Sequence, residues 1–208
     1  MQIKFWGVRG SIPSGNPETA GVGGNTTCVE IRCGDELIII DTGTGVRKLG
    51  MSLMKEMPVK ATILFSHVHW DHIQGFPFFA PFFIPGNEFR VIGGTSLPST
   101  IEEVLNQQMT PPCFPVKTDL FGSKITYQDV KPGDVIEGEN YKITLTALYH
   151  PNGCYAYRIE HEGQTLVFST DCEHYEDKPN KNLIELSRDV DALIYDAQYT
   201  EDEYYGLN

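Results

Sequence analysis

Three of the six histidines in this chain lie within seven residues, in the segment "SHVHWDH" at positions 66–72. Because alternate residues of an extended segment face the same side, His67 and His69 are expected to point in one direction. Asp71 and His72 follow as the chain turns. Imidazole and carboxylate groups are common ligands of zinc and similar divalent ions. The spacing predicts a metal-binding loop in which two ligands face one ion and two face another.

Other residues capable of chemistry follow apolar segments elsewhere in the chain. They are Asp41 after "LIII", His150 after "LTALY" and Asp171 after "VFST". Side chains at the ends of neighbouring strands converge at one edge of a sheet, where ligands usually bind. We therefore expect all three to lie near the histidine loop. A turn histidine at His150 and turn-capping roles for the two aspartates are the simpler alternatives.

Short apolar segments separated by Gly- and Pro-rich turns make up most of the sequence and are typical of strands. Nine are expected: "QIKFWG", "TCVEIRC", "ELIIID", "ATILFS", "RVIGG", "YKITLTALY", "CYAYRIE", "TLVFST" and "DALIYDA". Helices are predicted at "GVRKLGMSLMKE", at "PSTIEEVLNQQM" after Ser99 and Thr100, and at "NKNLIELSRD" with Leu183, Ile184 and Leu186 on its buried side. Strands in two sheets with helices outside predict an α/β layered sandwich.

The composition limits the classes of function. No linker divides the 208 residues, so we expect one domain, residues 1–208. The net charge of -12 argues against binding to long nucleic acids, which takes a basic face, but it allows a small anionic substrate beside divalent metals. No apolar run approaches the roughly 20 residues of a membrane span, and "MQIKFWGVRGSIP" does not resemble a secretory signal. We expect a cytoplasmic protein without a membrane partner.

Several residues with reactive side chains have ordinary interpretations. The five cysteines form no CxxC pair and are predicted to be reduced thiols: Cys28, Cys33, Cys113, Cys154 and Cys172. Cys172 adjoins Asp171, so a role as zinc ligand stays an alternative. His161 in "EHEGQ" and His174 in "CEHYED" are interpreted as exposed loop residues. Arg9 in "GVRGS" is interpreted either as a surface residue or as a phosphate-binding group.

The segment "FPFFAPFFIPGNEF" at positions 76–89 is dense in Phe and Pro. A loop that faces the core is the favoured interpretation. The alternatives are the wall of an apolar pocket beside the metal loop and the contact of a homodimer.

The motif "HVHWDH" matches the HxHxDH motif of the metallo-β-lactamase fold hydrolases, and Asp41, His150 and Asp171 recur in that family's order. The match spans essentially the whole chain and implies the family's αββα four-layer sandwich. The segments "FWGVRGSIP", "GGNTTC" and "DTGTGVRKLG" resemble the phosphodiesterase-like branch. That branch is similar to the phosphoribosyl cyclic phosphodiesterases and distantly to tRNA 3′-processing endonucleases.

The resemblance implies a dinuclear centre of two zinc ions, with manganese or iron as substitutes. The implied ligands are His67, His69 and His150 for the first ion, Asp71 and His72 for the second, and Asp171 as the bridge. Two metals that share a hydroxide favour hydrolysis. Asp71 is expected to act as the catalytic residue that orients this hydroxide and takes its proton. Asp41 is expected to lie behind the ligands and to fix an imidazole tautomer.

The family normally has one more histidine ligand after the strand seen here as "DALIYDA". The chain ends at Asn208, and no histidine follows His174. We therefore expect the family's last strand and helix to be missing. Three consequences stay open: His174, Cys172 or another subunit supplies the ligand, the second ion binds weakly or not at all, or the chain is an inactive remnant.

The leading hypothesis is a metal-dependent hydrolase of a small phosphodiester, such as a cyclic nucleotide or a cyclic phosphate. Hydrolysis of a lactone or thioester is the enzymatic alternative, because the same hydroxide attacks a carbonyl carbon. A binding or scaffold domain that has lost the second metal is the non-enzymatic alternative.

Overall fold

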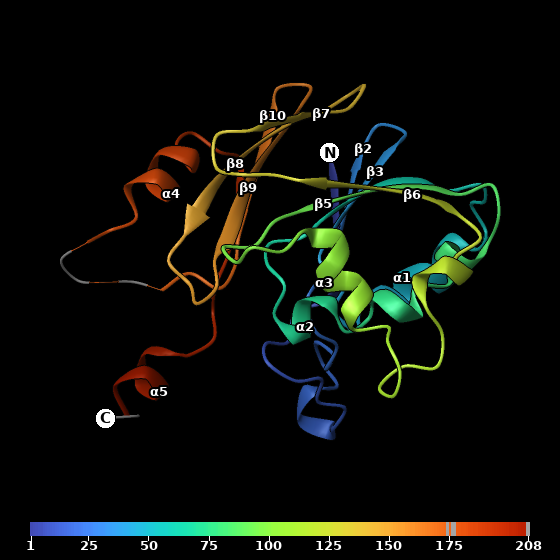
Figure 1. Cartoon of the computed structure of the whole chain (residues 1–208). Helices are drawn as coiled ribbons and strands as arrows, with labels where there is room; N and C mark the ends of the chain where they lie inside the picture. The colour runs from blue at the N-terminus through green and yellow to red at the C-terminus, as the bar shows by residue number, and fades with distance from the viewer. Residues whose placement is uncertain (174, 176–177, 207–208) are drawn as a thin grey trace.

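The computed structural model of this chain describes residues 1–173, 175 and 178–206. Two β-sheets pack face to face, and helices cover their outer faces (Figure 1). This arrangement confirms the predicted α/β sandwich of two sheets between helices. Among the described residues, no helix is long and apolar enough to cross a membrane.

The larger sheet contains, in spatial order, β1 (Gln2–Gly7), β2 (Cys28–Cys33), β3 (Glu36–Ile40), β4 (Lys60–Leu64), β5 (Glu88–Gly93) and β6 (Lys124–Asp129). Strands β3 to β6 are parallel, so their carboxyl ends lie at one edge. Successive side chains face opposite sides of a strand. In β3, Leu37 and Ile39 pack toward the helices, whereas Ile38 and Ile40 pack toward the second sheet.

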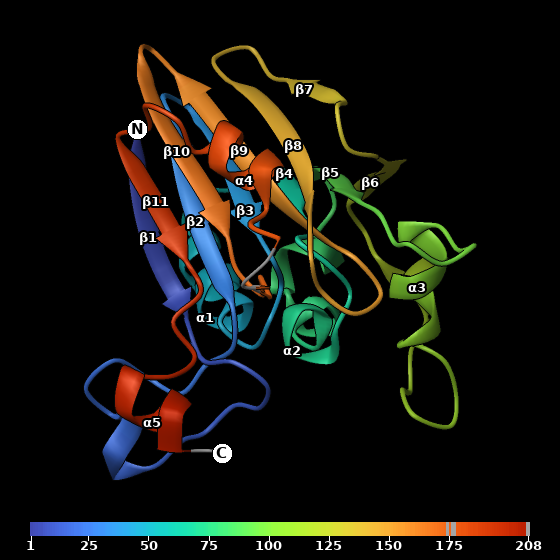
Figure 2. The same ribbon diagram turned by 90° about the vertical axis from the view of Figure 1, so that its left-hand side faces the viewer.

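The smaller sheet contains, in spatial order, β11 (Ala192–Tyr195), β10 (Gln164–Ser169), β9 (Cys154–His161), β8 (Lys142–Leu148) and β7 (Val135–Glu137). Strand β9 is antiparallel to both β8 and β10, so these two strands run in the same direction. Their carboxyl ends therefore lie at the same edge of the sheet. Figure 2 shows β1 and β11 as the edge strands at one side of the sandwich.

The helices are short, with eight residues at most among those that the structure describes. They are α1 (Val46–Leu53), α2 (Trp70–Ile73), α3 (Ile101–Gln107), α4 (Lys181–Leu186) and α5 (Glu201–Gly206), with 3₁₀ turns η1 (Pro17–Thr19), η2 (Phe76–Phe78), η3 (Ala80–Phe83) and η4 (Thr118–Leu120). Leu49 of α1 and Ile101 of α3 pack on the larger sheet, and Leu183 of α4 packs on the smaller one. A capping box of Thr100 and Glu103 starts α3, as the sequence predicts.

Three details of the fold test the sequence predictions for individual segments. The Phe-rich segment faces the core in part: Phe76, Phe79 and Phe82 are fully buried, whereas Phe78 and Phe83 are exposed. The prediction that Ile184 is buried is wrong, because the residue is 53% exposed. Helix α4 has only six residues, and Leu183 is the one that it buries fully against the sheet. Strands β6 and β7 were not expected from the sequence.

Candidate metal centre

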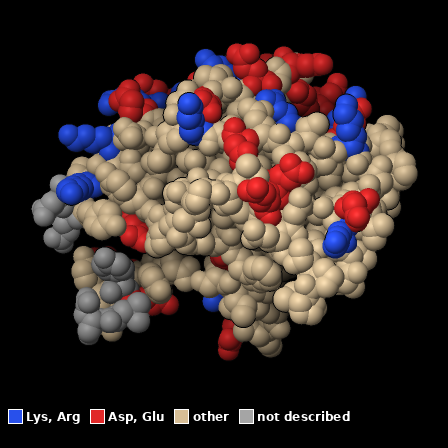
Figure 3. Space-filling model, viewed as in Figure 1, with Lys and Arg blue, Asp and Glu red and all other residues tan. Residues whose placement is uncertain are grey.

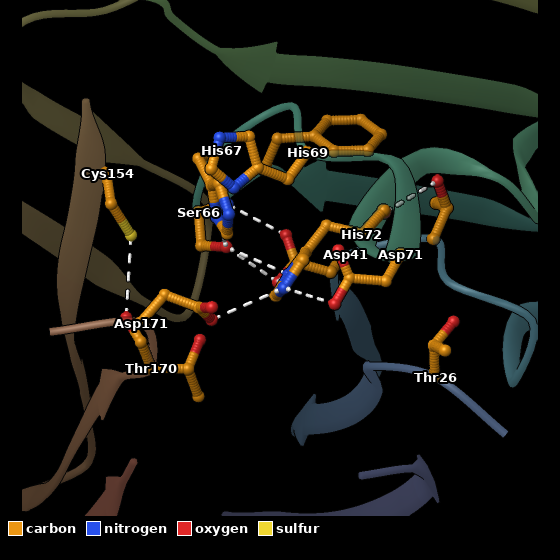
Figure 4. A network of polar contacts seen from close by, with 12 residues as sticks. Thr26, Asp41, Ser66, His67, His69, Asp71, His72, Cys154, Thr170 and Asp171 are labelled. Atoms are coloured by element: carbon orange, nitrogen blue, oxygen red, sulfur yellow. Dashed lines mark hydrogen bonds and ion pairs between the residues drawn. The ribbon is translucent and has the colours of Figure 1, made fainter. Parts of the chain in front are cut away.

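The ends of four strands bring the residues of the site to one edge of the sandwich. Asp41 follows β3, Ser66 and His67 lie in the loop after β4, His150 lies in the loop after β8, and Asp171 lies in the loop after β10. The backbones of Asp41 and Asp171 are left-handed, with φ of 59° and 56°, a conformation that aspartate tolerates. The backbone therefore turns sharply after β3 and after β10, and the side chains of Asp41 and Asp171 converge on the site (Figure 4).

Two groups of three side chains share His67. His67, His69 and His150 offer ligand atoms that all lie within 4.8 Å of one another, and the same holds for His67, His72 and Asp171. The distance from His69 Nδ1 to His150 Nε2 is 3.0 Å, and the distance from His72 Nε2 to Asp171 Oδ2 is 3.3 Å. Asp171 Oδ1 is 3.9 Å from His150 Nε2. Asp171 therefore lies between the two groups.

The ring of His67 has the geometry of a metal ligand. The Ser66 hydroxyl donates its single hydrogen to Asp41 Oδ2 at 2.7 Å, so it can only accept from His67 Nδ1, which is 3.1 Å away. The proton of neutral His67 is thereby placed on Nδ1. Nε2 then carries a bare lone pair, and it is buried with no hydrogen-bond partner among the residues that the structure describes. Because an unpaired buried acceptor is costly, a divalent cation fits this position.

Asp41 orders the ligands from behind. Its carboxylate is fully buried and accepts three hydrogen bonds: from the Ser66 backbone N–H at 2.8 Å, from the Ser66 hydroxyl, and from His72 Nδ1 at 2.7 Å. An imidazole held through Nδ1 presents Nε2 to the site. Asp41 thus orients His72 directly and His67 through Ser66.

The charged side chains of the site shift one another's pKa values. Burial, and then the neighbouring His72, lower the pKa of His67 from 6.5 to about 2. Burial also opposes the charged form of His72, but the carboxylates of Asp41 and Asp171 outweigh it and raise the pKa of His72 to about 10. Burial of Asp171 is likewise outweighed by the hydrogen bond and charge of His72, and its pKa is lowered. The cluster thus attracts positive charge while keeping His67 neutral.

Asp71 lies at the margin of the cluster. Its Oδ2 is 3.6 Å from His72 Nε2 and accepts the backbone N–H of Ser11 at 2.7 Å. It belongs to neither group of three, although the structure brings it beside the second. Ser11 itself has a φ of 66°, so a strained residue of the N-terminal loop delivers this N–H.

A family model covers most of the chain. The model of the beta-lactamase superfamily domain matches residues 37–206. The chain belongs to this superfamily. Its two sheets and flanking helices have the metallo-β-lactamase fold, and the resemblance seen in "HVHWDH" is thereby confirmed at the level of the family.

Two known proteins match nearly all of the chain. Ribonuclease Z of Methanosarcina acetivorans is 24% identical over 97% of this chain and 76% of its own length. The probable metallo-hydrolase YhfI of Bacillus subtilis is 26% identical over 98% of this chain and 75% of its own length.

Solved structures show the same fold. Human tRNase Z, short form, superposes with a TM-score of 0.69 over 99% of this chain and 82% of that one, at 15% identity. Zinc-bound PqqB from Methylobacterium extorquens gives 0.66 over 95% and 73%, at 14% identity. A diphosphatase of the PhnP family gives 0.63 over 92% and 72%, at 19% identity.

The remaining residues singled out in the sequence have varied positions. The prediction that His161 is exposed is wrong: its exposed fraction is 6%, and its Nδ1 donates a hydrogen bond at 2.7 Å to the carbonyl of Asn140 in the loop before β8. Cys172 is buried and free, and the ligand groups found among the described residues do not include it. His174 lies outside the described residues. Arg9 lies in the N-terminal loop, where its backbone bonds to Asn25.

Sequence reasoning missed two contributors to the site. Ser66 precedes His67 in the quoted motif, and a hydroxyl next to a ligand histidine was a usable signal. Ser11 was not recognisable, because it acts through its backbone N–H over a separation of 60 residues.

A cavity of about 480 Å³ adjoins the second group. It lies between the edge strands β1 and β11, and His72 and Asp171 form part of its wall. Phe5, Leu193 and Tyr195 contribute apolar surface to it. The cavity is large enough for a small organic molecule beside the cluster.

Proposed function

We propose that this member of the superfamily is a metal-dependent hydrolase of a small phosphodiester, such as a cyclic nucleotide or cyclic phosphate. The observation that carries the proposal is the buried Nε2 of His67, which belongs to both ligand groups and has no hydrogen-bond partner within the described part of the chain. A buried histidine with a purely structural role is expected to have hydrogen-bond partners for its ring nitrogens. The relatives named ribonuclease Z, metallo-hydrolase and diphosphatase support hydrolytic chemistry.

Each residue of the cluster receives a role in this proposal. The proposed ligands are His67, His69 and His150 for one ion and Asp71 and His72 for a second, with Asp171 between them. Zinc suits these donors, and manganese or iron are substitutes. A bound pair of such ions supplies Lewis acidity and lowers the pKa of water toward roughly 7.

Asp71 is the proposed general base. Its side chain is 12% exposed, against 2% for His72, so it is the more open of the two side chains. The Ser11 N–H holds Oδ2 in place, which keeps the carboxylate oriented for proton transfer. Asp41 is fully buried, and its proposed role is to fix the imidazoles of His72 and, through Ser66, of His67.

The surface favours a small anionic substrate over a long nucleic acid. The net charge is -12, and the face in Figure 3 shows Lys and Arg interspersed with Asp and Glu, with no continuous basic area on that face. The cavity beside His72 and Asp171 provides space for the organic group of a small ester. Because part of its wall is apolar, a lactone or thioester is the second candidate substrate.

The test is a substrate panel with zinc-loaded protein: bis(p-nitrophenyl) phosphate, a 2′,3′-cyclic nucleotide, a lactone and a thioester. We expect turnover of the phosphodiesters, its loss with a chelator, and its return when zinc is added back. Asp71→Asn should lower kcat by at least about 100-fold, whereas Asp119→Asn, a change at an exposed residue of η4, should not. Turnover of the carbonyl esters alone would replace the proposal by the second candidate. No turnover of any substrate by zinc-loaded protein would favour the non-catalytic alternative.

A further inference from the structure

Helix α2 is a single turn that contains two of the proposed ligands, Asp71 and His72, and a helix of this length is not stable by itself. It has four residues, and its N-cap, His69, makes no side-chain capping bond that involves a described residue. Isolated helices shorter than about 12 residues are marginal in water. The positions of Asp71 and His72 must therefore be fixed by neighbouring segments.

The first of these segments is the turn after β3. The backbone N–H of Thr42 donates to the carbonyl of His72 at 2.8 Å, and the N–H of Gly75 donates to the carbonyl of Thr42 at 2.8 Å. The approach is backbone to backbone, since a Cβ added at Gly43 would lie 2.4 Å from the carbonyl oxygen of Asp71. A shift of this turn would therefore move both ligands.

The turn is held in its place by Thr26. The hydroxyl of Thr26 accepts the N–H of Thr44 at 2.8 Å, and the hydroxyl of Thr44 accepts the N–H of Thr26 at 2.9 Å. The same Thr26 oxygen accepts a hydrogen bond from Gln74 Nε2, just after α2, at 3.2 Å. Thr26 is fully buried, and in Figure 4 it lies on the opposite side of His72 from Asp171.

We infer that Thr26 is a positioning residue of the metal centre. Its one oxygen joins the turn after β3 to the end of α2, and so fixes Asp71 and His72 at the second ligand group. This gives a role to the segments "GGNTTC" and "DTGTG", which contain Thr26 and Thr44 and contribute no ligand to either group. The inference rests on the proposed function, because it concerns the affinity of the same centre for metal.

Zinc affinity tests the inference without any substrate. Thr26→Val keeps the shape of the side chain and removes the acceptor, whereas Thr26→Ser keeps the hydroxyl. The matched control is Thr62→Val: Thr62 is also a buried threonine, but its hydroxyl bonds to Tyr141 within the sandwich, away from α2. Affinity is measured by competition with a chromogenic chelator below the melting temperature of each variant. Gln74→Leu, which removes only the bond to Thr26, is the second variant if Thr26→Val does not fold.

We expect Thr26→Val to bind zinc at least about 10-fold more weakly, as for other groups that orient ligands, and Thr26→Ser to stay within about threefold of the unaltered protein. Thr62→Val should lower the melting temperature but leave zinc affinity unchanged. Unchanged zinc affinity in Thr26→Val, or in Gln74→Leu where that variant is used, would overturn the inference. Equal weakening of zinc binding in Thr62→Val would do the same. Neither outcome would overturn the proposed function. An unaltered protein that binds no zinc would overturn the proposed function together with the inference.

Discussion

Asp41 Oδ2 lies 2.7 Å from His72 Nδ1, and both side chains are almost completely buried. This pair sets the direction of the His72 ring, so that Nε2 points to Asp171. With His72 charged, the proton on Nε2 occupies the place that a metal ion would take. Metal binding is therefore expected to release this proton.

Replacement of Asp41 by Asn should weaken metal binding. Asn has nearly the same shape, but its amide lacks the charge and can present a donor to His72 Nδ1, which then favours the wrong tautomer. We expect zinc affinity to fall about 10- to 100-fold. Isothermal titration of metal-free protein measures this. Asp191→Asn, at a surface residue that caps Thr165, is the control; an equal loss of affinity there would contradict the assignment.

Removal of the unpartnered His67 nitrogen should stabilise the metal-free protein. His67→Leu replaces a buried acceptor that has no partner by an apolar group, which should raise the free energy of unfolding by about 1 kcal/mol. The same change should weaken zinc binding at the group formed by His67, His69 and His150 and lower the zinc content per chain. His161→Leu, which loses a satisfied hydrogen bond, should instead destabilise the protein. Chemical denaturation with chelator present distinguishes the two, and destabilisation by both variants would argue against a metal site at His67.

The stability of the metal-free protein should be greatest near pH 6.5. The pKa of His72 is raised from 6.5 to about 10, so its folded form keeps a proton that the unfolded chain has lost, and stability falls as the pH rises from about 6.5 toward 10. The pKa of His67 is lowered to about 2, so below pH 6.5 only the unfolded chain binds that proton, and stability falls again. Melting temperatures in chelator from pH 4 to 10 measure this. A continuous rise through pH 9 would be incompatible with a charged His72.

A methyl group at Gly75 should disturb the centre. Its Cβ would lie 2.2 Å from the carbonyl oxygen of Gly43, although its own φ of -85° suits any residue. Gly75→Ala should lower the free energy of unfolding by roughly 1–3 kcal/mol and weaken zinc binding. Gly15→Ala is the control, because no atom of the described residues lies within 4 Å of its added Cβ. Equal melting temperatures of the two variants would contradict the close packing of α2 on the turn after β3.

Local sequence was sufficient to place the cluster. His67, His150, Asp41 and Asp171 each follow a strongly apolar strand, and parallel directions within each sheet bring such positions together at one edge. Their convergence thus depends on topology that the strand pattern already implies. The roles of these side chains as ligands stay a prediction.

The failures have long-range causes. His161 looked like a residue of an exposed hairpin, but a loop 21 residues earlier covers it. Strands β6 and β7 were missed because their exposed and partly exposed positions give "KITYQD" and "VIE" no continuous apolar run. Ser11 and Asp71 are 60 residues apart in the sequence, so their hydrogen bond depends on the tertiary fold. A short window of sequence contains no residue pattern that predicts the burial of His161, the two strands or the Ser11 contact.

The central claim is that the cluster around His67 is a dinuclear metal centre. The most direct test is the zinc content per chain, measured by elemental analysis of untagged protein that has been stripped, reloaded and dialysed. We predict two zinc ions per chain, and a lower content in His67→Leu. One zinc ion or fewer in the unaltered protein would contradict the claim.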